Sequence, residues 1–119
     1  MIAGSFSGAE IFAEEVSQDI RRRMQKAGRA AFDMAVDLTP VDRGYLQNAW
    51  TLSVDRAVYR DPEEPGPGVI QNLSSVSSGS TLYLTNGKSY AEYINDGTSR
   101  IPAHNMLEQA VSAALDELY

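Results

Sequence analysis

The 119-residue chain contains no cysteine, a single histidine and a single tryptophan. Without cysteine there is neither a disulfide framework nor a thiolate metal site, and one histidine excludes a metal site with several histidine ligands. No segment approaches the ~20 consecutive apolar residues of a transmembrane helix. The first residues also lack the basic segment and long apolar stretch of a secretory signal. We therefore expect synthesis in the cytoplasm, no metal and no membrane contact.

Positive charge is also scarce, because 10 Lys and Arg residues stand against 16 Asp and Glu, a formal net charge of −6. Proteins that wrap around nucleic acid draw affinity from neutralising its phosphates, so this balance argues against such a binder. The length of 119 residues and the hydrophobic fraction of 43% instead indicate one globular domain, residues 1–119, with a modest core.

Apolar residues recur at steps of three and four over residues 8–38, which predicts one long amphipathic helix. Ser7 and Glu10 have the spacing of a capping box at its start, and Pro40 would end it. Such a helix would be roughly 45 Å long, so we expect part of it to pack outside the domain's own core. Gly28 within it indicates a close crossing or a bend.

A dense basic segment lies on this predicted helix, at Arg21, Arg22, Arg23, Lys26 and Arg29, and acidic residues precede it. The favoured interpretation is a solvated helix face whose charges pair along the helix. A second interpretation is contact between the basic segment of one copy and the acidic end of its neighbour. Direct contact with DNA is the third.

The middle of the chain predicts a small antiparallel sheet. Alternation over residues 47–59 indicates a half-buried strand, residues 69–73 a short one, and residues 81–85 a strand closed by an Asn86-Gly87 turn. Residues 60–80 are rich in proline, glycine and serine. They predict an exposed, flexible loop with an acidic first half.

A short aromatic turn follows the strands. Tyr90, Tyr93 and Ile94 fall at i, i+3 and i+4, so one helical turn would place them on one face. Gly97 can take the positive φ that ends such a turn. A last amphipathic helix is predicted over residues 103–118.

These elements predict the α+β fold class, with a long N-terminal helix and a C-terminal helix packed on a small antiparallel β-sheet. We assign Trp50, Tyr90 and Leu107 to the core.

Candidate catalytic residues are few. A serine hydrolase would depend on His104, which stands beside a predicted helix start, where capping or packing is the commoner role. Glu63 and Glu64 lie in the predicted flexible loop, which is a poor platform for paired-carboxylate catalysis. The chain has no glycine-rich phosphate-binding motif in a strand-to-helix context. We therefore predict no enzymatic activity and no cofactor.

Several short motifs occur in order along the chain: TPVDRGYL at residues 39–46, Tyr90-Ala91, Gly97-Thr98 and a helix opening after Pro102. In this combination the chain resembles the neck and tail-completion proteins of long-tailed bacteriophages, which are also described as tail components. The resemblance covers about residues 10–117. Asn95-Asp96 stand where a glutamate often precedes Gly-Thr, and residues 104–106 replace the usual Pro-Phe; these departures concern the subfamily and not the fold.

The resemblance implies a structural virion protein that forms a ring, expected to be a hexamer, at the head–tail junction. The ring would join a head-closure or connector protein to the tail tube or tail terminator protein and leave a channel through which DNA passes without specific binding. A net negative charge suits such a channel. The predicted subunit or partner interface comprises Arg21, Arg22, Arg23, Arg43, Asp61, Glu63, Glu64, Tyr93, Asp96 and Arg100.

Other interpretations stay open at this point. A tail terminator or minor tail protein would cap the tail tube itself, and a small DNA-binding regulatory protein would use the basic segment. A hydrolase built on His104 comes last. The predicted interface segments also have plain structural explanations, as a solvated helix face, a disordered loop and an intramolecular corner.

Overall fold

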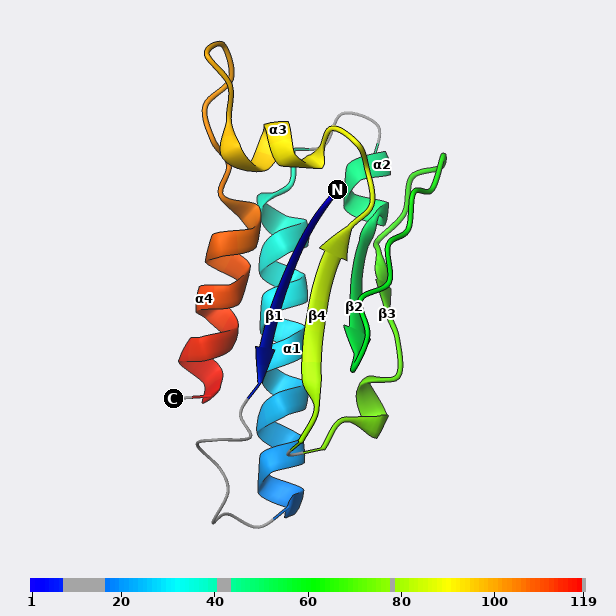
Figure 1. The fold of residues 1–119 in the computed structure, drawn as a ribbon, viewed down its shortest axis with the longest axis vertical. Helices are drawn as coiled ribbons and strands as arrows, with labels where there is room; N and C mark the ends of the chain where they lie inside the picture. The colour runs from blue at the N-terminus through cyan, green and yellow to red at the C-terminus, as the bar shows by residue number, and fades with distance from the viewer. Residues whose placement is uncertain (8–16, 41–43, 78, 119) are drawn as a thin grey trace.

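The computed structural model describes residues 1–7, 17–40, 44–77 and 79–118 (Figure 1). Its helices are α1 (Ser17–Leu38), α2 (Tyr45–Asn48), α3 (Ala91–Asp96), α4 (Met106–Leu118) and the 3-10 turn η1 (Leu73–Ser75). Its strands are β1 (Ile2–Ser7), β2 (Trp50–Val54), β3 (Val69–Ile70) and β4 (Thr81–Asn86).

Within the described residues the strands form one sheet in the order β1-β4-β2-β3. β4 pairs antiparallel with both β1 and β2, whereas β3 runs parallel to β2. A parallel neighbour requires the chain to travel back before it pairs, and residues 55–68 make this return beside the sheet (Figure 1). The predicted α+β class, with α1 and α4 packed on a small sheet, is confirmed, and the short β3 makes that sheet mixed.

Strand β1 was not predicted, because Ala3, Gly4 and Ser5 are small and give little hydrophobic alternation. Its last residue is Ser7, which the sequence assigned to a helix cap. Residues 8–16, including Glu10, lie outside the described part of the chain, so the cap and the first part of the predicted helix stay predictions.

Helix α1 buries one apolar stripe against α4 and the sheet, formed by the buried residues Ile20, Met24, Ala27, Ala31, Phe32 and Ala35. Gly28 lies in this contact, where an added Cβ would stand 3.0 Å from Leu52 Cδ2 and 3.2 Å from Leu82 Cδ1. The close crossing predicted at Gly28 is therefore confirmed. The 22 described helical residues correspond to about 33 Å.

Helix α4 runs beside α1 in the opposite direction (Figure 1). Its buried residues Met106, Ala110, Ala114 and Leu118 follow a four-residue step, which places them on one face.

Trp50, the first residue of β2, is fully buried, and its Nε1 donates to Thr39 Oγ1 at 2.7 Å. The core assignment of Trp50 is thus correct, and Leu107 is partly buried against the same core.

The strand predicted over residues 47–59 is shorter than expected. Its first residues belong to α2, and β2 ends at Val54. Asp55 then takes a left-handed conformation with φ 66°, and its carboxylate accepts the Thr81 N–H at 3.0 Å. The local side-chain bond turns the chain away from the strand direction.

Residues 55–68 cover the outer face of the sheet. Thr85 Oγ1 donates to the carbonyl of Val58, and Arg60 Nη1 donates to the carbonyl of Asn48 at 2.6 Å. In a half-buried strand the alternation would turn Thr51 and Ser53 toward solvent. The covering segment buries both side chains instead. This segment therefore packs on its own sheet. The flexibility predicted for residues 60–80 stays a prediction.

Candidate functional site

Helix α3 lies across one end of the molecule (Figure 1), and Gly97 ends it as predicted. The Gly97 N–H donates to the Tyr93 carbonyl at 2.9 Å, and its φ is 81°. An added Cβ would stand 2.7 Å from the Ala103 nitrogen. Both the positive φ and the lack of space make glycine the residue that fits here.

Two tyrosines face outward at α3, namely Tyr90 directly before the helix and Tyr93 within it. Tyr90 is 42% exposed and Tyr93 is 56% exposed, whereas Ala91 and Asn95 are the buried positions of the helix. The assignment of Tyr90 to the core is therefore wrong, because the inward face of α3 is the face of Ala91 and Asn95. Exposed tyrosines of this kind are common anchors in protein interfaces.

Residues 97–103, which we call the arm, project beyond α3 (orange in Figure 1). The Thr98 N–H donates to the Ile101 carbonyl at 2.8 Å. The Thr98 hydroxyl accepts the backbone N–H groups of Arg100 and Ile101 at 3.2 and 3.1 Å. The arm is thus closed by its own hydrogen bonds, and it exposes Arg100 together with Ile101, which is 40% exposed.

Asn95 fixes the base of the arm to α4, a role that sequence reasoning missed. Its side chain donates to Glu108 Oε1 at 2.6 Å and to Asp96 Oδ1 at 3.0 Å. Its Oδ1 accepts the Leu107 N–H at 2.9 Å, so Asn95 satisfies a free N–H of the first α4 turn from outside the helix. The residue is only 2% exposed. No local pattern indicates this role, because Leu107 and Glu108 lie on another helix.

Residues 61–65, which we call the acidic loop, lie at the other end of α3 from the arm (Figure 1). Asp61 Oδ1 is 2.7 Å from Lys88 Nζ, and the Lys88 side chain is only 8% exposed. Asp61 therefore holds the loop beside the segment that leads into α3. Glu63 and Glu64 remain exposed.

The basic face of α1 lies toward the opposite end of the molecule from α3 (Figure 1). Arg21, Arg22 and Arg23 are exposed, and a hollow of about 350 Å³ is lined by Asp19, Arg22, Arg23 and Lys26. Lys26 Nζ pairs with Glu117 Oε2 of α4 at 3.2 Å, an exposed bridge that contributes little stability.

The predicted interface residues thus fall at both ends of the molecule. Asp61, Glu63, Glu64, Tyr93, Asp96 and Arg100 gather at the α3 end, and the three arginines lie on α1. Arg43 is outside the described residues.

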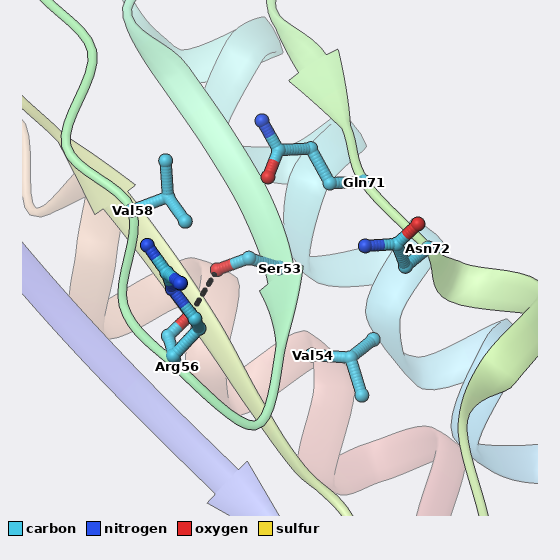
Figure 2. A pocket seen from close by; sticks show the side chains of 6 residues that line it. All are labelled: Ser53, Val54, Arg56, Val58, Gln71 and Asn72. Carbon is cyan, nitrogen blue, oxygen red and sulfur yellow. Dashed lines mark hydrogen bonds between the residues drawn. The ribbon is translucent and has the colours of Figure 1, made fainter.

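Another hollow, of about 280 Å³, opens on the outer face of the sheet and is lined by Ser53, Val54, Arg56, Val58, Gln71 and Asn72. Figure 2 shows the Ser53 hydroxyl pointing to the Arg56 carbonyl, to which it donates at 2.8 Å. The lining contains no histidine or carboxylate that could activate this hydroxyl as a nucleophile.

Over the described residues, no group of three or more His, Asp or Glu side chains is arranged to hold a metal. Nor is any helix in that part of the chain long and apolar enough to cross a membrane. The buried His104 Nδ1 has no hydrogen-bond partner among those residues, so no described carboxylate orients this nitrogen as a catalytic triad requires.

A comparison with known protein families matches residues 9–97 to the family described as "Bacteriophage HK97-gp10, putative tail-component". The chain belongs to this family. It is therefore a bacteriophage tail-component protein from a family of structural rather than enzymatic proteins, as the motifs at residues 39–46, 90–91 and 97–98 indicated. Comparisons with curated proteins and with solved structures gave no match.

The matched segment of this tail-component protein runs from the residues before α1 to Gly97. It contains the basic face, the acidic loop and α3. The rest of the arm and all of α4 follow it.

Proposed function

We propose that this tail-component protein forms a ring at the head–tail junction, where it joins the head-closure or connector side to the tail and leaves a channel for DNA. The observation that carries the proposal is the polarity of the subunit. The molecule measures 48 × 26 × 19 Å, and Tyr90, Tyr93, the arm and the acidic loop gather at one end of the long axis. The arm and the acidic loop lie at opposite ends of α3 (Figure 1). Unlike surfaces on one subunit make heterologous contacts, which close into rings when the rotation permits.

The distribution of charge supports two different partners. Exposed carboxylates of Glu63, Glu64 and Asp96 lie at the α3 end, while exposed Arg21 and Arg22 lie toward the other. Electrostatic complementarity mainly fixes partner choice and orientation. A ring whose subunits stand with their long axes along the channel would turn the α3 end, with Asp96, toward one neighbouring layer and the basic face of α1 toward the other. The head-closure protein and the tail tube or terminator would be those neighbours.

Native mass spectrometry of the purified protein, alone and mixed with the head-closure and tail proteins of the same phage, tests this proposal. We expect a closed ring of six copies, either free or on mixing. A ring that binds only the tail-tube protein would instead favour a tail terminator. A monomer that ignores both partners would contradict the ring.

A further inference from the structure

The arm and the acidic loop lie on opposite sides of α3, at the same end of the subunit (Figure 1). In the proposed ring, with cyclic symmetry and the long axes of the subunits along the channel, a contact between neighbours joins surfaces at one height on opposite flanks. Resting on the ring proposed above, we infer that the arm of one subunit docks on the acidic loop of the next, with Arg100 between Glu63 and Glu64.

The arm is suited to docking because it is already ordered. The Thr98 hydroxyl and backbone close its turn, and at its base the His104 N–H donates to the Ile94 carbonyl at 3.1 Å. A preformed projection loses little conformational entropy when it binds. Its exposed Ile101 and the adjacent Tyr93 add apolar area beside the guanidinium of Arg100.

The acidic loop is a matching surface. It is held from two sides, by the Asp61–Lys88 ion pair and by Asn48 Nδ2, which donates to the Glu64 carbonyl at 3.1 Å. The side chains of Glu63 and Glu64 take part in no ion pair with the described residues. The exposed carboxylates of Glu63 and Glu64 complement the charge of the Arg100 guanidinium. The exposed Pro65 beside them complements the apolar side chain of Ile101.

The same geometry assigns the basic face of α1 to a different contact. Arg21 and Arg22 lie toward the opposite end of the long axis from the acidic loop, so subunits that stand side by side with their long axes along the channel keep these groups apart. At the height of Glu63 and Glu64, Lys88 and Arg60 are engaged within the subunit, whereas the arm carries the exposed Arg100. The α1 arginines are thereby left for a neighbouring layer.

Cross-linking tests the pairing directly, because the chain has no cysteine of its own. Rings are assembled from equal amounts of Ser99→Cys and Glu64→Cys proteins and treated with a short bis-maleimide. We expect a covalent dimer in the mixture and none in either variant alone. The matched control mixes Ser99→Cys with Arg29→Cys, an exposed α1 position, and should give no dimer.

Charge reversal gives a second readout. Arg100→Glu, or Glu63→Arg with Glu64→Arg, should weaken ring assembly by about tenfold or more, as expected when a close charge pair is made repulsive. A chain carrying all three changes restores opposite charges at every contact and should recover assembly. Arg56→Glu, at an exposed position outside both proposed contact surfaces, should leave assembly unchanged.

The outcomes separate this inference from the ring proposal. A ring that forms normally with Arg100→Glu and gives no cross-link between residues 99 and 64 would overturn the arm contact and leave the ring intact. Failure of the unmodified protein to form a ring in any mixture would overturn both.

Discussion

The body of the molecule and its α3 end are built in different ways. Between α1, α4 and the sheet, stability comes from non-directional burial of apolar side chains such as Trp50, Leu52 and Met24. At the α3 end the chain is held by hydrogen bonds of Asn95 and by one ion pair, and large apolar side chains such as Tyr93 stay outside. The contrast teaches that the body determines the fold, while the end presents a contact surface.

The largest effect should follow from Trp50→Ala. It removes a fully buried indole and its hydrogen bond to Thr39, and we expect a loss of about 3–5 kcal/mol in the free energy of unfolding. Chemical denaturation measures it. Trp50→Phe keeps most of the volume and should lose only about 1–2 kcal/mol. Equal losses in the two variants would show that burial at this site is not what stabilises the body.

Asn95→Ala should have the next largest effect. It leaves the Leu107 N–H and the Glu108 carboxylate without their buried amide partner, and we expect a loss of about 2 kcal/mol. The control is Gln109→Ala, which removes an exposed bond to the His104 carbonyl and should change stability by less than about 0.5 kcal/mol. A loss no larger than the control's would contradict the anchoring role of Asn95.

The ion pair between Lys88 and Asp61 should contribute less. Asp61→Asn should destabilise by about 1 kcal/mol, since water screens a carboxylate whose side chain is 68% exposed. Lys88→Met should lower the free energy of unfolding by less than Asp61→Asn does. It leaves the exposed Asp61 carboxylate in water, whereas Asp61→Asn leaves a nearly buried ammonium without its partner. Denaturation at low salt and at about 1 M salt checks this, since salt should shrink the Asp61→Asn effect. A larger loss in Lys88→Met than in Asp61→Asn would contradict it.

The smallest effect on stability is expected for Tyr93→Ala, within about 0.5 kcal/mol, because the side chain is exposed. Assembly should nevertheless weaken about tenfold, since exposed tyrosines often anchor interfaces. Sedimentation velocity with a thermal melt separates the two effects. Leu115→Ala, at a 37% exposed position of α4, is the matched control and should change neither. Normal assembly of Tyr93→Ala would show that α3 takes no part in the contact between copies.

The parts of the fold that the sequence predicted depend on local pattern. The stripe of α1, the face of α4, the strand at residues 81–85 and the stop at Gly97 can all be inferred from neighbours within one or two turns. Strand β1 could not be predicted, because it is defined by pairing with β4, far along the chain.

The candidate site divides in the same way. Charged residues such as Glu63 and Arg100 were predicted as contact residues from their segments and from the family resemblance. Their placement on opposite flanks of α3 depends on long-range contacts, above all the Asp61–Lys88 pair and the Asn95–Glu108 bond. Periodicity carries no information about such contacts, and for the same reason it placed Tyr90 in the core.

The central claim is that the exposed side chains at the α3 end, such as Arg100 and Tyr93, join neighbouring copies while contributing little to the stability of the fold. Native mass spectra and thermal melts of the unmodified protein and of Arg100→Glu, each with the same phage partners, test it most directly. We predict a ring for the unmodified protein, mainly monomer for the variant, and equal melting temperatures. A variant ring of normal mass and stability would contradict the claim.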